Sequence, residues 1–323
     1  MTATTFPRLL GDIGGTNARF ARQLAPGAAI QDVAVYPGKD YATLQEAMQR
    51  YVADHGFEMP RWCAIGIANP VVGDHVQMTN HSWAFSIEGM RRALGMERFL
   101  VVNDFTALAY SLPALGAEDL RQVGGGQPVP GAALGLLGPG TGLGVSGLLA
   151  GPAGRGVVPI VGEGGHVSLC PADDVEAAVV AILQRRFGHA SAERALSGPG
   201  LLNLYQALAE LRGVAPPTLE VQAITQAALD GSDALCGEAV AMFCALLGSV
   251  AGNLALTLGA RGGMYIGGGI VPRLGERFDR SAFRARFEAK GRFHSYLAAI
   301  PVYVVQAKTS PALLGASRAL DEL

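Results

Sequence analysis

The chain has 323 residues, and half of them are hydrophobic, so it is long and apolar enough to bury the cores of two domains. Its 25 Lys and Arg residues nearly balance its 27 Asp and Glu residues. The net charge of −2 gives no basic excess of the kind that binds nucleic acid or an anionic membrane. The cysteines form no C-x-x-C pair and have no metal-ligand spacing with histidine. They are therefore predicted to be buried small hydrophobic residues in a reducing compartment: Cys63, Cys170, Cys236 and Cys244.

A glycine-rich segment near the N-terminus is predicted to be the turn of a β-hairpin, with short strands at residues 9–10 and 18–21. Its successive glycines let backbone N–H groups point at an anion, and the hydroxyl of Thr16 adds a donor. A purely structural turn is the alternative, because glycine is the usual turn residue. Asp12 would repel phosphates unless a divalent cation bridges them. It therefore indicates a Mg²⁺ site, direct or through water, or else a turn-stabilising aspartate.

One helix and two buried strands are predicted next. The helix begins at Asp40 or Thr43 and stops at Gly56. The strands cover residues 63–68 and 99–102. Alternating strands and helices imply a largely parallel sheet, in which ligands bind beyond the carboxyl ends of the strands.

An Asn-Asp pair stands at the carboxyl end of the second of these strands. Phosphoryl transfer needs positioning, charge neutralisation and often a carboxylate that takes the acceptor's proton, and Asp104 suits that role. The alternative is a helix cap, because a helix is predicted to begin near Phe105. Asn103 favours the catalytic interpretation, since an amide beside a carboxylate suits neighbouring sugar hydroxyls.

A second half with a similar plan is predicted beyond a Gly- and Pro-rich crossing at residues 113–130. Strands at 132–137 and 145–149 bracket a second glycine loop, GPGTGLG from Gly138, so a strand–turn–strand unit occurs twice and indicates two related halves. Later predicted elements are a helix from Asp173 or Asp174 to Phe187, a helix from Ser197, strands at 264–266 and 301–305, and a C-terminal helix from Ser310.

Residues 239–260 carry no charge and are long enough to cross a bilayer, with Gly248 and Gly252 at the spacing of membrane helix dimers. Polar Asn253 and Thr257 interrupt this apolar surface, and no aromatic belt marks its ends. We therefore expect a helix buried in the centre of a large domain, and no membrane partner.

A second polar cluster is GEGGH, in which glycines flank Glu163 and allow a ligand to approach the backbone. Glu163 and His166 offer an acceptor and a titratable donor on one turn, although an exposed loop with an incidental histidine is the alternative. Glu193 lies between two predicted helices, and by itself it is more typical of a solvated surface glutamate.

These motifs together resemble bacterial glucokinases, the ATP-dependent glucose 6-kinase branch of the sugar kinase, actin and chaperone ATPase superfamily. The resemblance extends from Gly11 to Leu314. The matching segments are GDIGGTNAR from Gly11, MTNHSWAFS from Met78, VNDFTA from Val102, GPGTGLGV from Gly138, GEGGHV from Gly162, HASAERALSGPGL from His189, GNLAL from Gly252, GGGIVPR from Gly267 and KGRF from Lys290.

The resemblance implies a role for each matching position. Asp104 would be the general base for the 6-hydroxyl of glucose, and Asn103, Glu163, His166 and Glu193 would hold the other hydroxyls. Asp12 would be oriented toward Mg²⁺, and Gly268 and Gly269 would let adenosine lie against the backbone. The ATP phosphates would be held by Gly11, Asp12, Ile13, Gly14, Gly15, Thr16, Asn17, Gly140, Thr141 and Gly142. Pro139 departs from an all-donor loop, because proline removes one backbone N–H.

The fold class expected from the resemblance is α/β, with two lobes of the actin-like ATPase/ribonuclease-H-like type and the active-site cleft between them. Residues 1–112 would form the small lobe, joined by the C-terminal helix 308–323, and residues 113–307 the large lobe. We expect a cytoplasmic homodimer that uses ATP and Mg²⁺. The alternatives are a non-catalytic sugar and nucleotide sensor, an actin-like or chaperone-like ATPase, a kinase of another hexose, and a kinase that uses polyphosphate.

Overall fold

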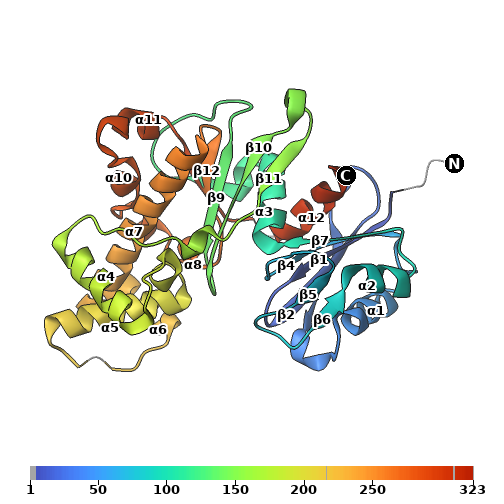
Figure 1. The fold of residues 1–323 in the computed structure, drawn as a ribbon, viewed down its shortest axis with the longest axis horizontal. Helices are drawn as coiled ribbons and strands as arrows, with labels where there is room; N and C mark the ends of the chain where they lie inside the picture. Colours follow the sequence, from blue (N-terminus) through green and yellow to red (C-terminus); the bar gives the residue numbers. More distant parts are fainter. Residues whose placement is uncertain (1–4, 216, 308–309, 323) are drawn as a thin grey trace. The chain divides into compact units, whose positions relative to one another are not determined.

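The computed structural model describes residues 5–215, 217–307 and 310–322. The chain divides into two compact units, Met1–Gly116 with Ala307–Leu323, and Ala117–Gln306. Each unit is built around one mixed β-sheet with helices packed on it (Figure 1). The first unit also contains a small hairpin of β5 (His75–Gln77) and β6 (Ala84–Ser86).

The first unit has a five-stranded sheet in the order β3-β2-β1-β4-β7. Strands β1, β4 and β7 are parallel, whereas β2 and β3 are antiparallel to their neighbours. The bounds of the strands are β1 Arg8–Ile13, β2 Asn17–Gln23, β3 Gln31–Pro37, β4 Trp62–Ile67 and β7 Arg98–Asn103. The helices of this unit are α1 Leu44–Asp54, α2 Ile87–Ala93, α3 Asp104–Ser111 and α12 Pro311–Asp321.

Alternating side chains of the first sheet bury two separate cores, because successive residues of a strand point to opposite faces. Leu9 packs in the cluster that includes Met48 of α1, while Leu10 packs with Leu313 of α12. Helix α12 approaches α3 closely, since a Cβ on Gly315 would lie only 1.6 Å from the carbonyl oxygen of Ala107. The C-terminal helix thus braces α3, the helix that begins at the Asn-Asp pair (Figure 1).

The second unit has a six-stranded sheet in the order β11-β10-β9-β12-β13-β8. Its strands are β8 Leu120–Gln122, β9 Leu134–Pro139, β10 Leu143–Ala150, β11 Val157–Ile160, β12 Gly263–Ile266 and β13 Val302–Val305. The order of an antiparallel hairpin followed by parallel strands repeats that of the first sheet, so the predicted repeat is confirmed. The expectation of a largely parallel sheet is wrong, because each glycine turn reverses the chain and creates antiparallel pairs.

The boundary between the two units, at Gly116 and Ala117, falls within the predicted crossing at residues 113–130, but this stretch is not only a connection. This segment contains β8, which pairs antiparallel with β13 at the edge of the second sheet. Val123 follows β8 and is buried in the core of the second unit. The glycines and prolines of this segment correctly indicate turns. The strand was missed because its three residues are too few to give a periodic signal.

Helix α7 is the central helix of the second unit (Figure 1). Its 25 residues are long and apolar enough to cross a membrane, but 67% of its most apolar window is buried inside the protein. A Cβ on Gly248 would lie 2.2 Å from the carbonyl oxygen of Phe283, so this glycine lets α10 pack directly on the helix. This packing agrees with the predicted core helix. The helices of the unit are α4 Asp174–Phe187, α5 Gly198–Arg212, α6 Val221–Asp230, α7 Ala234–Leu258, α8 Ile270–Leu274, α9 Glu276–Asp279, α10 Phe283–Glu288 and α11 His294–Ala298.

The cysteines follow the prediction at three of their four positions. Cys63, Cys236 and Cys244 are buried, and burial raises the pKa of the Cys244 thiol to about 11. Cys170 is exposed, so its prediction as a buried hydrophobic residue is wrong. It lies on the short segment before α4, between buried Leu169 and partly buried Pro171, where the chain runs along the surface.

Candidate active site

The first glycine loop joins β1 to β2, and its register places a charged pair across the hairpin. The N–H of Gly14 donates to the carbonyl of Asn17 at 2.9 Å, which closes the turn. Asp12 and Arg19 are then direct cross-strand partners. Nη1 of Arg19 lies 2.7 Å from Oδ2 of Asp12, and the hydroxyl of Ser310, before α12, donates to the same oxygen at 2.7 Å. Asp12 is therefore held in one orientation from two sides.

The Asn-Asp pair lies where β7 ends and α3 begins, and the two side chains have different roles in the helix. Asn103 is the N-cap, because its Oδ1 accepts the N–H groups of Phe105 at 2.9 Å and Thr106 at 3.3 Å. Its amide nitrogen faces the carbonyl of Asn69 at 3.4 Å. The cap predicted as an alternative for Asp104 is thus formed by Asn103, and Asp104 is the first residue of the helix.

The charge of Asp12 acts on Asp104, and the residue of β4 that lies between their strands is a glycine without a side chain. In the sheet Asp12 pairs with Gly66 of β4, and Gly66 pairs with Val102 of β7. A Cβ on Gly66 would lie 2.9 Å from the Cβ of Ala107 and 3.4 Å from the Cα of Asp104. Glycine at this position therefore lets the first turn of α3 approach the sheet.

The carboxyl group of Asp104 has a pKa raised to about 6. Burial is the main cause, since it disfavours the charged form, and the negative charge of Asp12 adds to it. The N–H of Phe105, which donates to Oδ1 of Asp104 at 2.9 Å, acts in the opposite direction. Asp104 is a carboxylate that changes charge near neutral pH, as a general base does.

The second glycine loop joins β9 to β10 in the same way. The N–H of Gly140 donates to the carbonyl of Gly142 at 2.8 Å, so this N–H closes the turn. The carbonyl of Gly140 accepts the N–H of Gly198 at 2.8 Å, and Gly198 is the first residue of α5. Thr141 at the tip is exposed.

The GEGGH segment packs on the strand that leaves this loop. A Cβ on Gly165 would lie 2.1 Å from the carbonyl oxygen of Leu143, so this position needs glycine for close approach. The backbone N–H of His166 donates to the carbonyl of Glu163 at 3.0 Å, and both side chains are exposed. The segment thus presents a carboxylate and an imidazole to solvent from a rigid base.

Glu193 differs from the solvated surface glutamate that its position alone predicts. It lies in a short 3₁₀ helix, Ala192–Arg194, and is half-buried. Its Oε2 accepts the N–H of Leu143 at 2.9 Å. In the second unit, the structure therefore joins Glu193, the GEGGH segment and the second loop around one residue, Leu143.

The third glycine segment of the second unit follows β12 and lies against the second loop. Gly268 has a φ of +77°, and a Cβ there would lie 2.3 Å from the carbonyl oxygen of Pro139. The N–H of Gly267 donates to the carbonyl of Leu137 at 2.9 Å. Gly268 and Gly269 are both exposed, so their backbone is open to a ligand.

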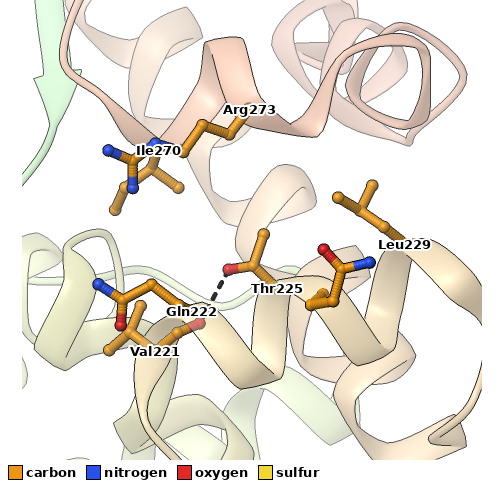
Figure 2. A pocket seen from close by; sticks show the side chains of 7 residues that line it. Val221, Gln222, Thr225, Leu229, Ile270 and Arg273 are labelled. Carbon is orange, nitrogen blue, oxygen red and sulfur yellow. Dashed lines mark hydrogen bonds between the residues drawn. The ribbon is translucent and has the colours of Figure 1, made fainter.

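A pocket of about 250 Å³ lies beside this third segment (Figure 2). Figure 2 shows α8, with Ile270 and Arg273, opposite the labelled side chains of α6. A Cβ on Gly198 would contact both Val221 in the pocket wall and the carbonyl of Gly140, so the pocket adjoins the second loop. The lining residues are Val221, Gln222, Thr225, Gln226, Leu229, Ile270 and Arg273.

The sequence prediction did not include three groups of this site: Arg19, Ser310 and the backbone of Leu143. The hairpin register was a usable signal for Arg19, because a turn centred on Gly15 and Thr16 sets Arg19 opposite Asp12. No local signal indicates Ser310, which contacts Asp12 across 298 residues of sequence.

The comparisons with known proteins agree with this arrangement. The sequence model of the glucokinase family matches residues 9–323. The chain is 56% identical over 318 residues to a glucokinase of Aromatoleum aromaticum, covering 98% of this chain and 95% of the relative. It is 53% identical over 317 residues to one of Chromobacterium violaceum, covering 98% and 90%. The structure of a glucokinase from an Antarctic psychrotroph has a TM-score of 0.89, with 34% identity, and covers 98% and 99%.

The fold and the glycine loops define a two-lobed sugar kinase of the actin-like ATPase class, which confirms the predicted fold class. Within that class the chain belongs to the glucokinase family. The predicted resemblance is therefore confirmed. Family membership also supports the predicted activity, ATP-dependent phosphorylation of glucose, and gives no support to a non-catalytic regulator.

Proposed function

We propose that Asp104 is the general base with which this enzyme transfers the γ-phosphoryl group of ATP to the 6-hydroxyl of glucose. The observation that carries this proposal is the half-buried carboxylate of Asp104, which directly follows the carboxyl end of β7 and whose pKa is raised to about 6. A base whose pKa lies just below the working pH is mostly ionised and still accepts a proton efficiently.

In the proposed reaction, oxygen O6 of glucose attacks the γ-phosphorus while Asp104 takes the hydroxyl proton. The bond between the γ-phosphorus and the bridging oxygen breaks, and ADP leaves with that oxygen. Glu163, His166 and Glu193 bind the other hydroxyls. One N–H of the Asn103 amide is left for a hydroxyl, because the amide oxygen caps α3 and the other N–H donates to the carbonyl of Asn69.

The nucleotide is proposed to bind the three glycine segments. In the second loop, the N–H groups of Thr141 and Gly142 and the hydroxyl of Thr141 serve as phosphate donors, because the N–H of Gly140 closes the turn. Adenosine lies on Gly268 and Gly269. The adjoining pocket takes the base between the apolar side chains of α6 and α8, while the polar residues there bind its edge (Figure 2). The first loop, from Gly11 to Asn17, is also proposed to bind the phosphates.

Asp12 is the proposed magnesium ligand. Its two hydrogen bonds, from Arg19 and Ser310, both fall on Oδ2, and among the described residues none reaches Oδ1. One oriented carboxylate oxygen fits Mg²⁺, which is usually bound by one or two carboxylates, water and substrate phosphates. When bound, Mg²⁺ would neutralise the phosphate charge that Asp12 alone would repel.

We further propose that the enzyme acts in the cytoplasm as a homodimer, the commonest symmetric assembly of soluble proteins. Sedimentation of the purified protein tests the assembly.

A coupled assay with a panel of sugars, each with ATP and with polyphosphate, tests the reaction. We expect ATP and glucose to give the highest kcat/KM. Asp104→Ala should lower kcat by roughly 10²–10⁴-fold while the protein stays folded. A wild-type rate for this variant would show that Asp104 is not the base.

A further inference from the structure

We propose that Glu193 is a positioning residue for the second phosphate loop, in addition to being a ligand of the sugar, and that it couples the two binding sites. This inference rests on the proposed function of the second loop and of Glu193. It concerns a contact that exists within one unit of the protein, between a side chain proposed to bind glucose and a backbone group next to a phosphate donor.

The contact itself is a charge-assisted hydrogen bond. Oε2 of Glu193 accepts the N–H of Leu143 at 2.9 Å, and Leu143 directly follows the donor Gly142. Glu193 is half-buried, so water competes only in part for its carboxylate. Among the described residues, no hydrogen bond reaches its other oxygen, Oε1, which leaves that atom for a sugar hydroxyl. One carboxylate can therefore bind sugar and loop at the same time.

The glycine at position 142 fits this carboxylate. A Cβ there would lie 2.5 Å from Oε2 of Glu193, far inside contact distance. The φ of Gly142 is not in the left-handed region, so the backbone does not itself require glycine. What a methyl group at position 142 would displace is the carboxylate. The residue type at Gly142 and the position of Glu193 thus depend on each other.

The segment that carries Glu193 forms a second hydrogen bond with the loop. The hydroxyl of Ser197 donates to the carbonyl of Glu193 at 2.9 Å, and the N–H of Gly198 donates to the carbonyl of Gly140 at 2.8 Å. The loop is therefore fixed on both sides of its proposed donors, at Gly140 and at Leu143. A shift of Glu193 changes the loop geometry directly, because only one hydrogen bond separates them.

The consequence is a coupling between the two substrates. Glucose bound to Oε1 restricts the carboxylate, and this restriction holds the loop in its phosphate-binding form. Glucose should then raise the affinity for nucleotide, and nucleotide should raise the affinity for glucose by the same factor. If Glu193 only bound sugar, replacing it would not change the affinity for nucleotide in the absence of sugar.

The test measures the Kd of Mg²⁺–ADP by calorimetry, without sugar, for the full chain and its variants. Glu193→Ala should weaken binding by about tenfold or more, the range of one charge-assisted hydrogen bond. Glu193→Gln should weaken it less, because an amide oxygen still accepts the N–H of Leu143. The matched control is Glu163→Ala, which removes another proposed sugar ligand. Among the described residues, no hydrogen bond joins the exposed Glu163 side chain to the loop, so this variant should leave the Kd unchanged.

A double-mutant cycle tests the route of the effect. Gly142→Ala should weaken Mg²⁺–ADP in the wild-type background but add little to Glu193→Ala, because the carboxylate that the methyl group displaces is then absent. Additive losses would overturn the inference, and so would equal Kd values for the wild type and Glu193→Ala. Failure of the wild type to bind Mg²⁺–ADP would instead overturn the proposed function, and the inference with it.

Discussion

Replacement of Asp104 by asparagine should lower activity and raise stability at neutral pH. The amide has nearly the same shape and keeps an oxygen that can accept the N–H of Phe105, which now donates to Oδ1 at 2.9 Å. It carries no charge and takes no proton. The variant therefore removes the proposed base while it also removes a carboxylate that burial and Asp12 make costly to ionise.

The size of the stability gain follows from the pKa of Asp104. The difference between about 6 in the folded protein and the ordinary value of 3.8 corresponds to a ceiling of about 3 kcal/mol. Because the side chain is only half-buried, solvent screening reduces the expected gain to about 1–2 kcal/mol.

The pH dependence of the gain has a definite sign. A folded-state pKa above the unfolded value contributes stability that is complete below pH 3.8 and is lost as the pH rises through 6. The wild type therefore loses this contribution at neutral pH, whereas the stability of the asparagine variant does not change with pH at this position, because an amide does not titrate. The stability difference between the two should be full at pH 7 and should vanish near pH 4.

Urea unfolding of both proteins at pH 4, 5, 6 and 7 measures the difference, and a coupled assay measures kcat at pH 7. The matched control is Asp74→Asn in the same unit. There, hydrogen bonds from Ser86 and the N–H of Glu88 lower the pKa of the carboxyl group, so the control should lose stability at neutral pH. A clear loss of stability for Asp104→Asn at pH 7 would refute the argument that ionised Asp104 destabilises the folded protein. An unchanged kcat would refute the role of Asp104 as the general base.

The acid limb of kcat/KM should have an apparent pKa near 6, since Asp104 must be ionised to act. Asp12→Asn should shift the acid limb of kcat/KM to lower pH, because it removes a negative charge that raises the pKa of Asp104. An unchanged acid limb would contradict this effect of Asp12 on Asp104. Gly248→Ala should destabilise the protein by about 1–3 kcal/mol, because its Cβ meets the backbone of α10. Gly237→Ala in the same helix, where a Cβ has room, should instead stabilise by up to about 1 kcal/mol, and equal urea midpoints would refute this packing argument. Thr225→Trp should fill the proposed base pocket and raise the KM for ATP with little change in the KM for glucose, whereas an unchanged KM for ATP would place the base elsewhere.

Local signals in the sequence were sufficient for much of the fold. The glycine turns between apolar strands were correctly predicted as hairpins, because a tight turn depends on residues within a few positions of each other. Thr43 as an N-cap and the buried helix around Gly248 follow for the same reason. Parallel and antiparallel pairing was wrong in part, since it depends on which strands become neighbours, and a short edge strand such as β8 has no pattern of its own.

The sequence by itself identified the residue types of the site and the class of chemistry that they suit, because glycine loops and carboxylates after strands are local features. Only the tertiary structure decided how each group is held. It assigned the helix cap to Asn103, brought Ser310 to Asp12, and joined Glu193 to the N–H of Leu143, 50 residues away in sequence. The physical reason is that hydrogen bonds and burial depend on distance in space, and segments far apart in the chain meet only after the sheets and helices have packed.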